Sequence, residues 1–180
     1  DQFSIIGDVI QKNSNIDKKN FNLLIKQFLP KIEFEKLRFS SNNNFSFKIN
    51  KKFEVSDFIL DSKILIDELS VLNTLNLKNF FPNIKENLKF SDHKLSLVYN
   101  KESLYIEGNG NVLFQDNNDT LTYSLNEKDN IFNFKTSLRI NDNPFKIDFL
   151  NFKKNKALIK LEGSKNQKKE IHIKFFSINE

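Results

Sequence analysis

Leu121-Thr-Tyr-Ser-Leu125, Phe132-Asn-Phe134 and Phe145-Lys-Ile-Asp-Phe149 follow one another along the chain, and each places an apolar side chain at every second position. Successive side chains of a β-strand point to opposite faces of the sheet, so this period of two predicts strands with one apolar face. The same alternation occurs in Phe45-Ser-Phe-Lys-Ile49, Leu95-Ser-Leu-Val-Tyr99 and Ile171-His-Ile-Lys-Phe175. The pattern predicts a mainly β protein.

The apolar bursts from Lys31 onward recur at the spacing of roughly 8 to 12 residues that is typical of an antiparallel meander. Parallel pairs would need crossover connections of about a dozen residues or more, which the chain does not offer. Alternation alone leaves three architectures open: a closed sandwich, a closed barrel, and an elongated, curved, groove-like sheet. The predicted strands cover residues 31–40, 44–50, 53–61, 63–71, 94–100, 103–115, 120–126, 131–140, 144–150, 156–163 and 170–178.

The first thirty residues have a different pattern. Asn15 or Asp17 is a candidate helix N-cap, and Pro30 follows the expected end of that helix. Residues 4–10 fit either a helical turn or a strand. We therefore divide the chain into a short helical lead-in, residues 1–30, and an antiparallel β-sheet region, residues 31–180. The apolar positions of the predicted helix are Phe21, Leu24, Ile25 and Phe28.

Two internal segments need a separate interpretation. Residues 75–88 break the period of two and contain Pro82, so we expect a loop or short helix that turns Phe80 and Phe81 inward and caps one end of the sheet. Gly108-Asn-Gly110 fits either a hairpin turn or one long strand with a glycine bulge. Because the chain opens at Asp1 and its last burst ends near the C-terminus, we expect a fragment of a longer protein.

Composition narrows the classes of function. The chain has a net charge of +5, but its lysines are dispersed and it has only two arginines, Arg38 and Arg139. Arginine is the usual residue for forked contacts with phosphates and bases, so we expect a solvated basic face and no nucleic-acid partner. The absence of cysteine excludes disulfides, thiolate metal sites and cysteine nucleophiles.

Candidate catalytic residues are few. The two histidines, His93 and His172, have no partners at metal-ligand spacing. No nucleophile elbow, Walker loop or dinucleotide fingerprint occurs, and only four glycines are available to form a phosphate-binding loop. We therefore expect a protein that is not an enzyme, with no catalytic residues, no metal site and no cofactor.

The residue pattern of several stretches resembles that of a known protein family. Phe21-Asn-Leu-Leu-Ile-Lys-Gln-Phe-Leu-Pro30, Phe53-Glu-Val-Ser-Asp-Phe-Ile-Leu-Asp-Ser-Lys-Ile64 and Leu104-Tyr-Ile-Glu-Gly-Asn-Gly-Asn-Val112 are similar to the AsmA-like proteins of Gram-negative bacteria, and to the large YhdP-type members in particular. The resemblance rests on serial strands of the form apolar-x-apolar-x-Gly-x-Gly and not on an invariant motif. It covers most of the chain.

The resemblance implies an elongated periplasmic protein, anchored in the inner membrane through a segment outside this chain, whose β-strands form a groove for phospholipids that move between the inner and outer membranes. Exposing an acyl chain to water costs about 0.8 kcal/mol per methylene, so a continuous apolar channel would be needed. The expected partners are phospholipid acyl chains and adjoining β-strands of the longer chain. Unpaired strand edges would also let an isolated fragment self-associate.

The alternative is a non-catalytic β-sandwich, a structural or interaction domain of the cell envelope whose apolar residues form an ordinary closed core. The two hypotheses differ in whether the apolar face is covered. An open trough would expose far more apolar surface than the few hundred square ångströms usual for a monomer. The residues expected to line the lipid groove are Phe45, Phe47, Ile49, Leu95, Leu97, Leu104, Ile106, Phe132, Phe134, Phe145, Ile147 and Phe149.

Overall fold

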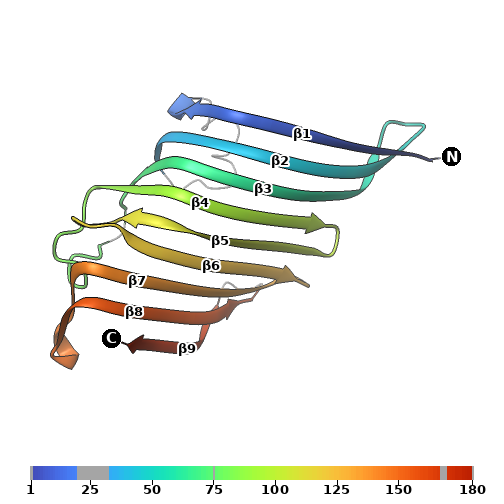
Figure 1. The fold of residues 1–180 in the computed structure, drawn as a ribbon. Coiled ribbons are helices and arrows are strands. Elements are labelled where there is room, and N and C mark those ends of the chain that lie inside the picture. The colour runs from blue at the N-terminus through green and yellow to red at the C-terminus, as the bar shows by residue number, and fades with distance from the viewer. Residues whose placement is uncertain (1, 20–32, 75, 167–169, 180) are drawn as a thin grey trace.

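A computed structural model describes residues 2–19, 33–74, 76–166 and 170–179 of the chain. These residues form nine antiparallel strands in one open, uncurled sheet, in which each strand pairs with the next strand in sequence (Figure 1). The mainly β, antiparallel meander is therefore confirmed. The elements are β1 (Gln2–Asp17), β2 (Phe34–Asn50), β3 (Val55–Leu72), β4 (Asn87–Asn100), β5 (Ser103–Leu113), β6 (Asp119–Lys128), β7 (Ile131–Ile147), the 3-10 helix η1 (Asp148–Leu150), β8 (Phe152–Lys165) and β9 (Ile171–Asn179).

Strand register separates the two faces of the sheet as the alternation predicts. Leu97 of β4 lies opposite Ile106 of β5, which continues the same cross-strand row to Leu125 and Phe134. We call the side of the sheet that carries this row the apolar face. The neighbouring row, which points to the other side, contains Ser96, Glu107, Ser124 and Lys135. We call that side the polar face.

The helical lead-in over residues 1–30 is not supported, because residues 2–17 form β1. Asn15 and Asp17, the candidate helix caps, lie opposite Arg38 and Lys36 of β2. Pairing with β2 therefore decides the conformation of this stretch and outweighs its local helical pattern. The apolar positions of the expected helix, Phe21 to Phe28, lie outside the described residues.

Several predicted strands merge into single long strands, because polar residues that suggested turns are satisfied inside the sheet. The Ser41 hydroxyl donates to Gln11 Oε1 at 3.0 Å, and the Ser62 hydroxyl donates to Asn43 Oδ1 at 2.7 Å. In β7 the expected break between strands 131–140 and 144–150 is an irregularity within one strand, where Asp142 has a φ of 59°. Proline is tolerated at such bulges because it has no ladder hydrogen bond to donate there.

One end of the sheet carries a small closed core, which we call the end cluster. The connection between β3 and β4 brings the Phe81 ring to 5.3 Å from the Phe145 ring and 6.0 Å from the Phe114 ring. Phe81 is buried, as expected, but Phe80 remains 39% exposed and contributes its carbonyl, which accepts a hydrogen bond from the Lys146 amide. The end cluster consists of buried Phe81, Ile140, Phe145, Ile147 and Ala157, with Leu77, Ile84, Leu138, Phe152, Ile159 and Ile178 packed against them.

Candidate functional site

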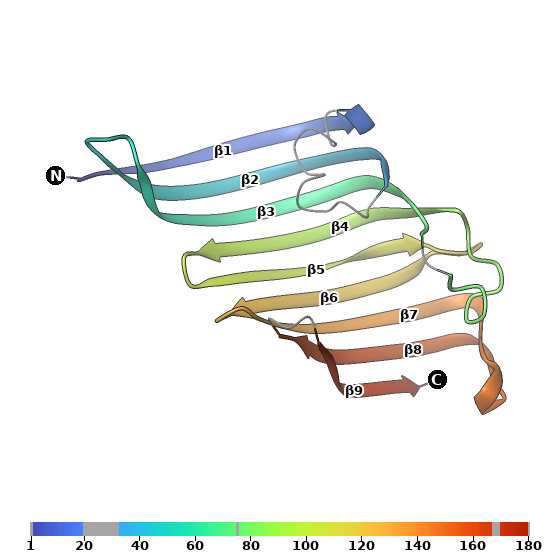
Figure 2. The same ribbon diagram turned by 180° about the vertical axis from the view of Figure 1, so that it is seen from behind.

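The apolar face is uncovered over the middle of the sheet. Figures 1 and 2 show the strands in a single layer when the sheet is seen from either side. Leu97, Ile106, Leu125 and Phe134 are only half-buried, although they lie in the middle of a nine-stranded sheet. Within the described residues, no second sheet packs on this row. From β4 to β7 the apolar face therefore offers a continuous surface for apolar contact, whereas the same row carries Ser62 on β3 and Asn43 on β2.

On this face, aromatic rings cover the glycines of neighbouring strands. Gly108 is paired with Tyr123, and a methyl group at Gly108 would come within 2.6 Å of the Tyr123 ring. Gly163 is covered in the same way by Phe134. Such cross-strand covering of a glycine by an aromatic ring stabilises a sheet position that has no side chain of its own. Gly7 is covered by Phe45 and Gly110 by His93.

This arrangement settles the interpretation of residues 108–110. Both glycines belong to the continuous strand β5, so the long-strand alternative is confirmed and the hairpin alternative is wrong. The irregularity lies on the partner strand, where the register shifts between Ser91 and Lys94 and Asp92 has a φ of 54°. Gly110 has no side chain, and the His93 ring occupies the space that a side chain there would fill.

The structure places nine of the twelve expected lining residues in the part of the sheet outside the end cluster. Phe145 and Ile147 instead belong to the end cluster and are almost fully buried. Phe149 lies in η1 rather than in a strand, and its side chain is 84% exposed. The nine residues are Phe45, Phe47 and Ile49 of β2, Leu95 and Leu97 of β4, Leu104 and Ile106 of β5, and Phe132 and Phe134 of β7.

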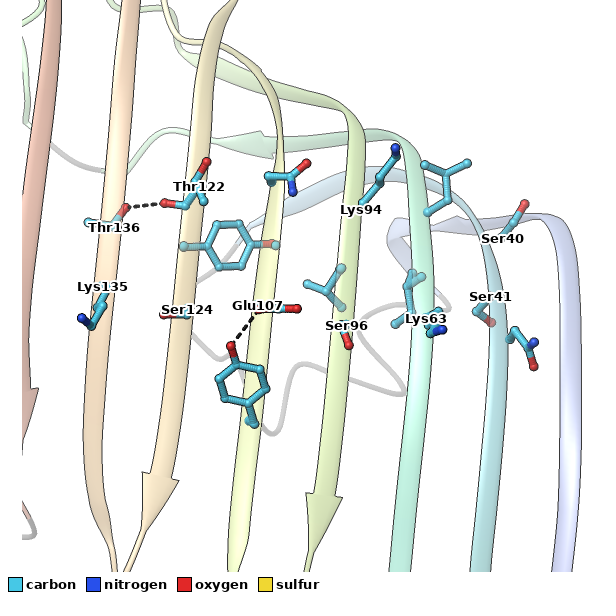
Figure 3. Close-up of a pocket in the computed structure, with 18 of the residues that line it drawn as sticks. Ser40, Ser41, Lys63, Lys94, Ser96, Glu107, Thr122, Ser124, Lys135 and Thr136 are labelled. Atoms are coloured by element: carbon cyan, nitrogen blue, oxygen red, sulfur yellow. Dashed lines mark hydrogen bonds between the residues drawn. The ribbon is translucent and has the colours of Figure 1, made fainter.

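A broad hollow of about 1130 Å³ lies on the polar face, not on the apolar face (Figure 3). On β8 it is lined by Lys160 and Glu162, whereas Leu161 between them, which points to the apolar side, does not line it. Figure 3 shows that its floor includes short hydroxyl side chains such as Ser96 and Ser124. Alternation does not predict this hollow, because it depends on the side-chain lengths of eight neighbouring strands taken together.

The hollow carries positive charge. Lys135 pairs with Glu162 at 3.1 Å, and the Tyr105 hydroxyl donates to Glu107 at 2.7 Å, an interaction that raises the pKa of Tyr105. Lys63 and Lys94 make no ion pair with any described residue. The basic character of the chain is thus displayed on the side of the sheet that faces away from the apolar surface.

The two histidines lie far apart in the sheet, on β4 and β9. His93 is buried, its Nε2 lies 2.9 Å from the Asn111 carbonyl oxygen, and burial lowers the pKa of its ring. His172 is exposed, 3.9 Å from Glu170. In the described part of the chain no group of three or more histidine, aspartate or glutamate residues is placed to hold a metal ion.

A buried polar network, which sequence reasoning missed, joins the connection between β5 and β6 to the irregular part of β7. Asp119 Oδ1 accepts hydrogen bonds from the Asn141 amide at 2.8 Å and from Asn143 Nδ2 at 2.9 Å. Gln115 donates to the Pro144 carbonyl at 3.0 Å. Asp119 Oδ2 has no partner, and burial raises the pKa of this carboxyl group. In the sequence, the only indication of this network is the pair of asparagine-rich segments, 117–118 and 141–143.

Comparisons with known proteins give no relative: no family model, no curated protein and no solved structure matches this chain. In the described residues, no helix has both the length and the apolar character that are needed to cross a bilayer. The arguments for function therefore rest on the two faces of the sheet. One face suits non-covalent contact with apolar ligands, and the other is polar and cationic.

Proposed function

We propose that this chain is a segment of an AsmA-like β-groove protein of the cell envelope that binds lipid acyl chains on its apolar face and supports phospholipid transport between the inner and outer membranes. The observation that carries the proposal is the uncovered row of Leu97, Ile106, Leu125 and Phe134. The proposed role is non-enzymatic and requires no cofactor.

The dimensions of the apolar face suit an acyl chain. Neighbouring strands lie about 4.8 Å apart, so the three intervals from β4 to β7 span roughly 14 Å. One acyl chain extends across about half of a hydrocarbon core that is ~30 Å thick, or roughly 15 Å. Each methylene removed from water on this face contributes up to about 0.8 kcal/mol. The apolar row from β4 to β7 is therefore about as wide as one acyl chain is long.

The groove itself is a further part of the proposal. The sheet is open and uncurled, so adjoining β-strands of a longer chain would have to extend it beyond β9 and curve around the lipid. The proposed location is the periplasm, with an inner-membrane anchor in a segment outside this chain. Nucleic acid is not a proposed partner, because the exposed positive charge comes from dispersed lysines without arginine forks.

The alternative function is a structural or interaction domain in which another sheet covers the apolar face. The end cluster favours this alternative, because it shows that the same face packs into a closed core wherever a segment covers it. A covering sheet would bury Leu97 and Phe134 as fully as Ile140 is buried. The two functions therefore make opposite predictions for the middle of the apolar face.

Photocrosslinking from neighbouring residues on opposite faces tests the proposal. Benzophenone side chains are introduced at Leu97, which points to the apolar face, and at Ser96, which points to the polar face, and the protein is irradiated with native phospholipid vesicles. The proposal expects lipid adducts at position 97 and far fewer at position 96. An absence of adducts at 97, or equal yields at both positions, would contradict it.

A further inference from the structure

β1 is an edge strand of the sheet that the described residues form, and it is apolar on both faces. Phe3 and Val9 point to the apolar face, since they lie opposite Ile49 and Asn43. Ile6 points to the polar face, where its side chain is 83% exposed. An exposed edge strand presents a row of unpaired backbone N–H and C=O groups to any chain that can pair with it. When a strand carries apolar side chains on both faces, such pairing also buries apolar surface on both sides of the sheet.

The features that usually protect an edge strand are few in Gln2–Gln11, where Asp8 is the one charged residue. This stretch has no proline, lysine or arginine, and its register with β2 is regular until it shifts between Gln11 and Ser14. The opposite edge, β9, is shorter, carries His172 and Lys174, and has a register irregularity at Glu162 and Gly163 of its neighbour β8. Charges and bulges on an edge oppose further pairing. β1 is therefore the edge strand that is more favourable for pairing with another chain.

We propose that two copies of this chain pair through antiparallel contact of their β1 strands, over residues 2–10, about a two-fold axis at Ile6. In this register Ile6 lies opposite Ile6 of the second copy, Phe3 lies opposite Val9, and Ser4 lies opposite Asp8. No like charges then face each other directly. The serine hydroxyl is placed to donate to the aspartate carboxylate across the interface.

The symmetry of this arrangement explains why it closes. A two-fold axis perpendicular to the sheet reverses the strand direction but keeps each face on its own side. Residues of the same parity oppose each other, so both copies present their outward backbone groups at the same positions. The apolar faces then form one continuous surface. Because the contact is isologous, it yields a closed dimer and not an open filament. The inference does not depend on lipid binding.

Disulfide trapping tests the register, because the natural chain has no cysteine. Directly opposed residues of an antiparallel pair have Cβ atoms about 4.5–5.5 Å apart, close to the range that a disulfide bridges. The proposal expects rapid oxidation of Ile6→Cys to a covalent dimer. Phe53→Cys is the matched control, since Phe53 is also 83% exposed but lies in the turn between β2 and β3. Equal rates for Ile6→Cys and Phe53→Cys, or faster trapping of Ile173→Cys on β9, would overturn the proposal.

Sedimentation equilibrium provides a second measurement that does not need oxidation. Ile6→Lys places two ammonium groups opposite each other, and the dimer dissociation constant should rise at least about tenfold. Phe53→Lys should leave it unchanged. Circular dichroism of both variants confirms that the sheet is retained, because Ile6 is exposed and contributes little to folding. A natural chain that stays monomeric up to its solubility limit would also overturn the proposal.

Discussion

The apolar face behaves differently at its covered end and in its middle. At the covered end, Phe81 from the β3–β4 connection packs on Phe145, and both rings are almost fully buried. In the middle, Phe134 and Leu97 belong to the same kind of alternating strand but are only half-buried. The comparison shows that alternation determines which face a residue occupies. Burial is decided by a segment that breaks the alternation.

The largest expected effect comes from breaking the end cluster. Phe145→Ala should lower the free energy of unfolding by about 3–5 kcal/mol, because it removes a fully buried ring and leaves a cavity. The matched change in the open region is Phe47→Ala. Phe47 stacks on Phe45 at 6.2 Å but is only half-buried, so its loss should be about 1–2 kcal/mol. Urea unfolding measures both changes, and equal losses would mean that the middle of the face is covered as well.

A somewhat smaller effect is expected where an aromatic ring covers a glycine. Gly108→Ala would place a methyl group within 2.6 Å of the Tyr123 ring and should cost about 1–3 kcal/mol. The cost should shrink when the same change is made in a Tyr123→Ala background, where the ring is absent. A double-mutant cycle by chemical unfolding measures this coupling. Additive effects would show that the ring does not lie over Gly108.

Asp119 gives the stability of the fold a pH dependence. Burial raises the pKa of its carboxyl group in the folded state, so the folded state holds the proton more tightly than the unfolded state does. Stability should therefore decrease as pH rises from about 4, the usual aspartate value, through the raised pKa of the folded state. Asp119→Asn retains an oxygen for Asn141 and Asn143 and should remove this decrease. Thermal unfolding measured across this pH range checks the slope.

Asp57 provides a control whose contribution to stability depends on pH in the opposite direction. Its hydrogen bond with Lys48 lowers the pKa of its carboxyl group, so its contribution is lost as pH falls. Because Asp57 is exposed, added salt should screen this effect, whereas the effect of Asp119 should persist. A decrease of stability with rising pH that survives in Asp119→Asn would contradict the role assigned to the buried carboxyl group.

The smallest effect is expected on the polar face. Lys135 and Glu162 form a 3.1 Å ion pair at the hollow, but the Lys135 side chain is largely exposed and that of Glu162 is partly exposed. Lys135→Ala should change the free energy of unfolding by less than about 0.5 kcal/mol, and high salt should reduce the difference further. Chemical unfolding at two ionic strengths measures it. A loss as large as that of Phe47→Ala would show that the polar face is less open to solvent than its geometry indicates.

Local patterns in the sequence predicted the strands and their faces, because side-chain direction follows from a period of two. Leu95, Leu97, Leu104 and Ile106 lie on one face, as expected. The same reasoning failed where pairing partners decide the conformation. Residues 2–17 form a strand because β2 offers them a partner, and Ser41 and Ser62 continue their strands because polar partners lie across from them.

Features that depend on contacts distant in sequence were the least predictable. The inward turn of Phe81 followed from the break in alternation and from Pro82, but that pattern gave no reason to separate it from Phe80, which remains exposed. The network around Asp119 joins residues that are more than twenty positions apart in the sequence, so no local pattern predicted it. The hollow on the polar face arises only when eight strands lie side by side.

Thiol labelling tests most directly whether the middle of the apolar face is open. Single cysteines are introduced by Leu97→Cys in the middle of the face, Ser96→Cys on the polar face and Ile140→Cys in the end cluster, in a chain that has no cysteine of its own. An open face predicts that position 97 reacts nearly as fast as position 96, while position 140 is protected. Protection of position 97 equal to that of position 140 would contradict an open apolar face.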